Sequence, residues 1–180
     1  MDSENLAVAD IETILARWEP ARAVAVYPVP DPVAGDQQMA AVEPRTPLPD
    51  PARVAASGGS AAVAPAALGD SPADFLAVQP DLGTKMPPRF VRLVRTMRVT
   101  ATRKTARSEL RAQRWHTEDP VLWRPYGPGA AVHGSRPVHR RLTSKDRERL
   151  RTLFAEHGRA DLVRPAAADP AAPQSGRSWA

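Results

Sequence analysis

The sequence predicts a mainly α-helical protein: an N-terminal amphipathic helix, a long Pro- and Ala-rich disordered linker, and a small basic helical module. Three observations predict this fold class. Apolar residues recur at helical spacing near both ends of the chain, Pro is concentrated between those regions, and acidic and basic residues are separated along the chain. The predicted division is an acidic amphipathic helix at 1–20, a linker at 21–85, the basic helical module at 86–164 and a disordered tail at 165–180.

Composition limits how much of the 180-residue chain one compact core could contain. The chain has 32 Ala, 20 Pro and 10 Gly, whereas Leu, Ile, Val and Phe together make up only about a fifth of it. A chain this poor in large apolar residues buries too little apolar area to offset the entropy lost on ordering its whole length. We therefore expect part of the chain to be disordered.

The N-terminal helix is the clearest predicted element and spans residues 3–18. Ser3 is a suitable N-cap, and Pro20 ends the pattern. One face carries Val8, Ile11, Ile14, Leu15 and Trp18. A helix this short is marginal alone in water, so its apolar face packs either on the chain's own core or in a protein partner's groove. In the second interpretation the partner-binding residues are Ile11, Leu15 and Trp18.

The region between the helix and the basic module is predicted as linker. Residues 21–29 have the composition of a single strand, but Pro28 and Pro30 interrupt it. The Pro-rich and Gly/Ser-rich stretches that follow are typical of extended and flexible linkers. Within them, residues 71–78 begin with Ser71 and Pro72, which favour a helix start. This island is predicted either as a short recognition helix or as a transient turn.

Charge differs sharply between the two halves of the chain. Residues 1–84 have a net charge of −8 and residues 85–164 a net charge of +13, and the last sixteen residues are neutral overall, which gives the total of +5. A basic module of this kind is typical of proteins that bind nucleic acid or anionic lipid.

The segment 89–101 is predicted as a helix rather than a strand, because its apolar residues fall within one arc of a helical projection. The opposite side carries Arg89, Arg92, Arg95 and Arg98. The sequence VTATRKT at 99–105 favours a strand, so we expect a break there. A second helix follows, and one of its faces carries Arg103, Arg107, Arg111 and Arg114.

The basic segment predicts a nucleic-acid-binding surface. Nine Arg and Lys residues lie between 89 and 114 with a single acid, Glu109, whereas a merely solvated surface usually mixes both signs. A phosphate backbone would relieve the repulsion, with counterion release as the driving force. The candidate nucleic-acid-binding residues are Arg92, Arg95, Arg98, Arg103, Lys104, Arg107, Arg111 and Arg114. The alternative is a solvated face that has no ligand.

Aromatic residues alternate with arginines directly after this segment, at 114–129. The rings of Trp115, Trp123 and Tyr126 have two interpretations: they stack unpaired bases, or they hold together a small core. Further along, the segment 142–165 is predicted to form a helix that is capped by Thr143 or Ser144 and stops at Gly158. Pro165 removes most of a second helix, so no helix-turn-helix reader of DNA is predicted.

No catalytic residue, metal site or cofactor is predicted. The chain has no Cys, and its four His residues show no metal-binding spacing with a full ligand set. No apolar run approaches the length of a membrane span and the N-terminus is acidic, so a cytoplasmic location is expected. The predicted function is a non-enzymatic nucleic-acid-binding accessory protein of low sequence specificity, with DNA and RNA both open.

A second predicted function belongs to a different class. An interaction adaptor would dock on a protein partner through its amphipathic helix faces. Its critical residues would be Ile11, Leu15 and Trp18, or Phe90, Leu93 and Met97.

Overall fold

The computed structural model describes residues 3–33, 35–48, 72–79, 87–99, 105–126, 132–133, 136–137 and 139–164. The elements in chain order are α1 (Ser3–Ala16), β1 (Ala21–Pro30), β2 (Asp36–Pro44), α3 (Pro72–Ala77), β3 (Phe90–Leu93), α4 (Arg107–Gln113), β4 (Val121–Trp123), β5 (Val132–His133), β6 (Arg136–Pro137), β7 (Arg140–Arg141), α5 (Ser144–Glu156) and the 3-10 helix η2 (Ala160–Val163). The predicted tail at 165–180 lies outside these described residues.

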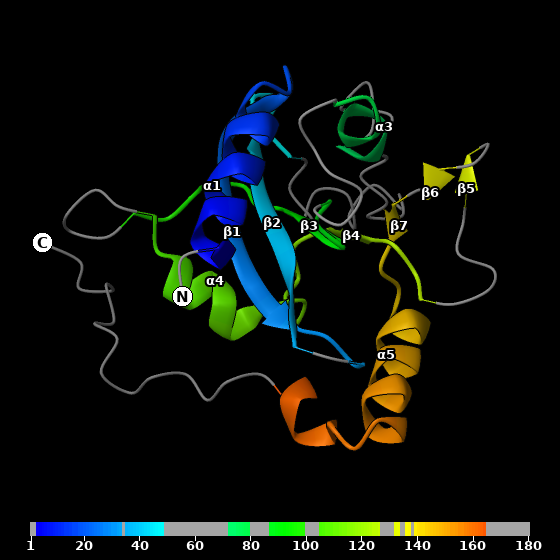
Figure 1. The fold of residues 1–180 in the computed structure, drawn as a ribbon. Coiled ribbons are helices and arrows are strands. Elements are labelled where there is room, and N and C mark those ends of the chain that lie inside the picture. Colours follow the sequence, from blue (N-terminus) through cyan, green and yellow to red (C-terminus); the bar gives the residue numbers. More distant parts are fainter. Residues whose placement is uncertain are drawn as a thin grey trace, which may run out of the picture.

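A five-stranded mixed sheet organises the described residues, in the order β1-β2-β3-β4-β7 (Figure 1). The hairpin strands β1 and β2 are antiparallel, β2 and β3 are parallel, and β4 and β7 continue the sheet in antiparallel pairs. The short strands β5 and β6 form a separate antiparallel pair. The mainly helical prediction is therefore wrong, since strand and helix take comparable shares of this mixed sheet structure.

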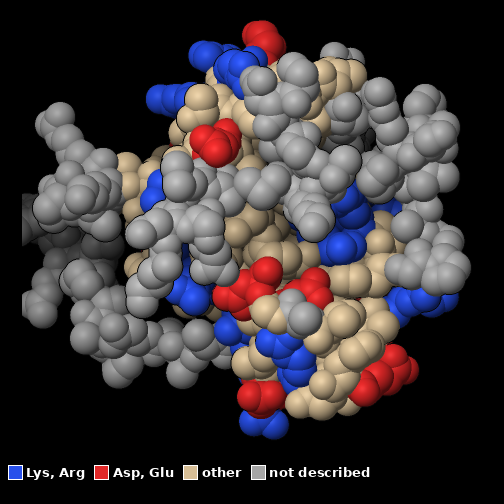
Figure 2. Space-filling view, viewed as in Figure 1, with Lys and Arg blue, Asp and Glu red and all other residues tan. Residues whose placement is uncertain are grey.

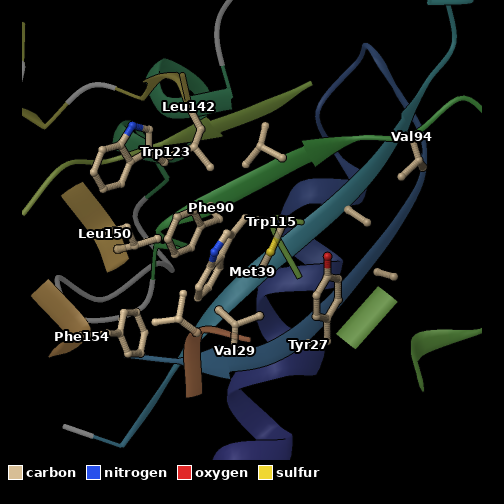
Figure 3. Close-up of a cluster of buried hydrophobic side chains, with 14 of the residues drawn as sticks. Tyr27, Val29, Met39, Phe90, Val94, Trp115, Trp123, Leu142, Leu150 and Phe154 are labelled. Atoms are coloured by element: carbon tan, nitrogen blue, oxygen red, sulfur yellow. The ribbon is translucent and has the colours of Figure 1, made fainter. Parts of the chain in front are cut away.

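Both faces of the sheet are covered by apolar packing. Side chains alternate along β3: Phe90 belongs to one hydrophobic cluster and Val91 to the other. The first cluster joins the sheet to α5 and to the segment after α4 through Phe154 and Trp115, and Figure 3 shows its buried rings together. The second cluster joins the opposite face to α1. The central strands are thus buried from both sides.

The apolar face of α1 packs on this sheet. Ile11 and Leu15 are fully buried and Trp18 is nearly so, in the cluster that contains Val26 and Val91. Of the two interpretations of this helix, packing on the chain's own core is the one the structure has. The residues predicted to bind a partner are core residues.

Three strands lie where the sequence predicted linker or helix. The hairpin β1–β2 occupies residues 21–44, and its prolines Pro28 and Pro30 lie in β1, an edge strand of the sheet. An edge strand tolerates proline because one side of its backbone has no ladder partner. The predicted helix at 89–101 is wrong: β3 occupies its first part, and all four of its residues are buried.

The N-terminus of α5 is capped as the sequence predicted. The Thr143 hydroxyl accepts a hydrogen bond from the Asp146 backbone N–H at 3.2 Å, and Asp146 Oδ2 accepts from the Thr143 N–H at 3.0 Å. Arg140 donates to the same carboxylate, at 2.6 Å from Oδ1. The helix ends before Gly158, whose φ of +68° favours glycine. The predicted cap at Thr143 is confirmed.

Replacing Leu15 by Ala should lower the free energy of unfolding by about 2–5 kcal/mol, because the truncation leaves a cavity in a fully buried cluster. Val33→Ala is the matched control, since Val33 is 61% exposed and its truncation should cost less than about 0.5 kcal/mol. Urea unfolding followed by tryptophan fluorescence measures both. Equal losses in the two variants would contradict the burial of α1 on the sheet.

Protonation of Asp146 at acid pH should lower the free energy of unfolding. Burial alone would raise its pKa, but hydrogen bonds from Arg140 and Thr143 outweigh it and lower the pKa below the usual 3.8. The contribution of this carboxylate is therefore complete above pH 3.8 and is lost as the pH falls through the lower folded-state pKa. Asp146→Asn should cost about 1 kcal/mol at pH 7. It should cost progressively less than that below pH 3.8, as measured by urea unfolding at each pH. A cost independent of pH would refute the assignment.

Candidate functional site

A polar cavity of about 280 Å³ opens beside the carboxyl end of β3, and we refer to it as the β3 cavity. It lies between the segment that follows β3, the helix α4 and the loop that leads to β4. Its charged and amide lining residues are Arg92, Arg95, Arg98, Glu109, Gln113 and Asp119. The cavity therefore combines three guanidinium groups with two carboxylates.

Arg92 forms the buried side of the β3 cavity. Its Nε donates to Asp119 Oδ2 at 2.8 Å, and its Nη2 donates to Gln113 Oε1 at 2.7 Å, so it ties β3 to α4 and to the loop before β4. Burial raises the pKa of Tyr27 well above its usual value, and the neighbouring Arg92 opposes that shift only in part. Tyr27 stays neutral, so Asp119 provides the anionic partner of this buried charge.

Arg98 and Glu109 form the exposed rim of the β3 cavity. Arg98 Nη1 lies 2.9 Å from Glu109 Oε1, and the Arg98 side chain is 75% exposed. Backbone contacts also join the two sides of this rim. The Ala106 N–H donates to the Arg98 carbonyl at 2.9 Å, and Val99 forms a β-bridge with Thr105. An exposed ion pair of this kind is weak, so an anion from solvent can compete for the guanidinium.

The buried carboxylate of Glu43 fixes the segment after β3. Its Oε2 accepts a hydrogen bond from the Met97 backbone N–H at 2.6 Å, and its Oε1 lies 3.1 Å from Arg22 Nη1. Glu43 belongs to β2, so this contact sets the position of the cavity rim relative to the sheet. Glu43 falls within the linker predicted at 21–85, and its only signal in the sequence is one acid in an apolar stretch.

The predicted nucleic-acid-binding residues do not form one surface. Arg92 is buried, whereas Arg95 and Arg98 line the β3 cavity and Arg111 is exposed on α4. Two of the predicted residues, Arg103 and Lys104, lie outside the described residues.

The remaining two arginines of the set are anchored in different directions. Arg107 Nη2 lies 2.8 Å from each carboxylate oxygen of Glu12, which connects α4 to α1. Arg114 follows α4 with a φ of +51° and donates to the Leu162 carbonyl, and burial lowers its pKa. Glu109 is therefore not the sole acidic partner of these arginines, since Glu12 and Asp119 from other segments pair with them as well.

The three aromatic residues predicted to stack bases belong to the protein's own packing. Trp115 and Trp123 are both 1% exposed, and both stack on Phe90, with ring centres 4.9 and 6.1 Å away. The ring of Tyr126 is covered by the Arg89 guanidinium, 3.9 Å from its centre. Of the two interpretations of these rings, the structure has the one in which they hold the core.

Opposite charges are interspersed on the face shown in Figure 2, where Lys and Arg side chains lie among Asp and Glu side chains. Exposed ion pairs also occur within the described residues, since Arg98 faces Glu109 and Arg151 faces Glu148. Within the described ranges, no cluster of three or more His, Asp or Glu side chains is suited to a metal ion. In the same ranges no helix has the length and apolarity needed to cross a membrane.

The chain resembles enzymes that form CoA thioesters. It is 38% identical over 160 residues to steroid-22-oyl-CoA synthetase of Rhodococcus jostii, a match that covers 88% of this chain and 24% of that enzyme. It is 39% identical over 123 residues to the medium/long-chain-fatty-acid–CoA ligase FadD17 of Mycobacterium tuberculosis, with 67% of this chain and 21% of that enzyme covered. The chain thus spans about a quarter of the length of the curated relatives it matches. No protein-family model matches it.

These relatives overturn the predicted function. They are CoA ligases and synthetases, so the prediction of a non-enzymatic nucleic-acid-binding accessory protein is wrong, and so is the prediction of a nucleic-acid partner. The adaptor alternative is overturned with it. The physical error was to treat the arginines of 89–114 as unpaired, whereas Arg92 and Arg107 have acidic partners from distant segments.

Removing the Arg92 side chain should be far more costly than removing an exposed arginine of the same cavity. Arg92→Leu leaves Asp119 and Gln113 without their buried donor and should lower the free energy of unfolding by about 3–5 kcal/mol. Arg98→Ala breaks only the exposed pair with Glu109 and should cost at most about 1 kcal/mol. Urea denaturation measures both, and a loss for Arg92→Leu no larger than that for Arg98→Ala would contradict the buried network.

Proposed function

We propose that this chain takes part in the formation of acyl-CoA thioesters, as the counterpart of about a quarter of a CoA ligase. The observation that carries this proposal is the 38% identity to steroid-22-oyl-CoA synthetase across 88% of the chain. The complete reaction then requires the counterpart of the remaining length of such an enzyme. The cytoplasmic location expected from the sequence stays a prediction.

The chemistry of thioester formation suits the β3 cavity. A free carboxylate must be activated before the thiol of CoA can displace one of its oxygens, and ATP is the co-substrate we expect for that activation. Each participant carries negative charge, and guanidinium groups bind carboxylate and phosphate oxygens well. Arg98 at the exposed rim is the residue of the β3 cavity best placed to meet such a group.

The apolar part of the acyl substrate is expected to bind elsewhere. The relatives are named for steroid and medium/long-chain fatty-acid substrates, which carry large apolar groups. In the described residues, the two apolar clusters are filled by core side chains, and the β3 cavity is lined by three guanidinium groups and two carboxylates beside a few apolar side chains. We therefore propose that this chain contacts the carboxylate or phosphate groups of the substrates rather than the apolar acyl tail.

A chimeric enzyme tests the proposal. The segment of the Rhodococcus jostii steroid-22-oyl-CoA synthetase that aligns with this chain is replaced by the chain, and CoA-thioester formation from a steroid carboxylic acid is followed by chromatography. The chimera should form the thioester. Arg98→Ala in the chimera should lower kcat/KM at least about tenfold through loss of one charge-assisted contact. Arg149→Gln, which removes an exposed charge that does not line the β3 cavity, should stay within about twofold of the chimera.

The outcome that contradicts the proposal is specific. A chimera that unfolds as cooperatively as the parent synthetase but forms no thioester would refute it. Where the chimera itself does not fold, the chain is added in trans to the parent enzyme lacking the aligned segment. Restored thioester formation supports the proposal, and its absence with both proteins folded refutes it.

A further inference from the structure

A second cavity, of about 640 Å³, lies beside α5 and on a different part of the fold from the β3 cavity, and we refer to it as the α5 cavity. It lies between the residue that follows Trp115, one face of α5 and the short helix η2, which adjoins α5 in Figure 1. Its charged or titratable lining residues are His116, Arg147, Arg151 and Arg164. Among the described residues that line it, none is Asp or Glu.

The walls of the α5 cavity are fixed by hydrogen bonds to backbone carbonyls. His116 Nε2 lies 2.6 Å from the Val163 carbonyl, and Arg114 donates to the Leu162 carbonyl, so η2 is held against the end of α4. Arg147 donates through Nε to the Trp115 carbonyl and through Nη2 to the Thr117 carbonyl, at 3.3 Å each. Residues 114–117 are therefore held against α5 and η2, which lie 30 to 48 positions further along the chain.

The positive charge of the α5 cavity is poorly compensated. Burial lowers the pKa of His116, the hydrogen bond to the Val163 carbonyl opposes this, and the charges of Arg114, Arg147 and Arg151 contribute further lowering, in keeping with the arginines that line the cavity. Burial and the charge of Arg141 lower the pKa of Arg147.

Arg151 has an acidic partner in Glu148. Its Oε2 lies 2.6 Å from Arg151 Nη2, but the side chains of Glu148 and Arg151 are 64% and 58% exposed, so the pair is weak and screened.

We propose that the α5 cavity binds the phosphate groups of a nucleotide ligand, and that CoA is that ligand. Guanidinium groups supply the multiple N–H donors that phosphate oxygens accept, and converging cations are stabilised by an anion that carries several charges. The volume lies in the range of cavities that hold a small ligand. The choice of CoA rests on the proposed function, whereas the phosphate chemistry rests on the residues of the cavity.

The geometry favours a phosphate over a plain carboxylate. Arg151 lies on α5 and Arg164 directly follows η2, so their donors approach from different directions, whereas one carboxylate offers a single planar edge. CoA carries a diphosphate and a 3′-phosphate on one ribonucleotide and could engage several of these donors together. ATP shares this chemistry, so the experiment includes both.

Binding is measured on the full 180-residue chain by isothermal titration calorimetry. The probes are CoA, dephospho-CoA, which lacks the 3′-phosphate, ATP, inorganic pyrophosphate, and pantetheine, which has no phosphate. CoA should bind and pantetheine should not. If dephospho-CoA binds more weakly than CoA, the 3′-phosphate binds in the α5 cavity. If ATP binds more tightly than CoA, ATP is the source of the bound phosphates and the assignment to CoA is overturned.

The variants are matched for charge and helix. Arg151→Gln should weaken CoA binding about tenfold, and the double variant Arg151→Gln/Arg164→Gln about a hundredfold, because each removes one charge-assisted contact to phosphate. Arg149→Gln removes the same charge from α5 at a position two residues away, on the side of the helix that does not line the cavity, and should bind within about twofold of the parent. All three substitutions are at exposed positions, so folding should be retained, and thermal unfolding checks it.

A second readout reports from inside the α5 cavity. The His116 pKa, followed by NMR of its ring protons, should rise on addition of CoA because the bound phosphates offset the positive charge around it. The phosphate site is overturned if none of the phosphorylated probes binds, if Arg151→Gln/Arg164→Gln binds CoA as tightly as the parent, or if Arg149→Gln weakens binding equally. An inactive chimera with phosphate binding intact refutes the proposed function alone, and an active chimera with no phosphate binding refutes this inference alone.

Discussion

Burial of β3 on both faces is the constraint on which the rest of the structure depends. The four residues of this strand sit between β2 and β4, and each is buried. Phe90 and Val91 supply apolar side chains to the two opposite clusters, but the same alternation directs Arg92 into the interior. A buried guanidinium without a partner would be strongly destabilising, so Asp119 and Gln113 must meet it there. That requirement fixes α4 and the loop before β4 around the β3 cavity.

The parts of the fold that local rules determine could be predicted from the sequence. The capping box at Thr143 and the apolar face of α1 depend on residues three or four positions apart, and both are present. The sheet could not be predicted in this way. A strand buried on both faces lacks the polar alternation that identifies an exposed one, and arginines every third residue in 89–98 fit a helical projection equally well. Pairing between β2 and β3 depends on residues about fifty positions apart.

Of the candidate site, only the sign of its charge could be predicted from the sequence. The excess of arginine indicated anionic ligands, but it could not show which guanidinium groups pair with other groups inside the fold. Their acidic partners come from far along the chain: Glu12 lies 95 residues before Arg107, and Asp119 lies 27 residues after Arg92. Charge counted within one segment therefore overstated the free positive surface. The relation to CoA ligases was not predicted from any short motif.

The arginines of this chain accordingly fall into two physical groups. Arg92, Arg114 and Arg147 donate to carbonyls or side chains within the fold, and their positions are set by packing. Among the described residues, Arg98 and Arg151 pair with exposed carboxylates, and such partners give way to a more highly charged anion. The first group provides rigid walls, because each of its members is anchored by at least one hydrogen bond within the fold. The second group can exchange a weak intramolecular pair for a ligand at little cost to folding, which is the property that a transient site for charged substrates requires.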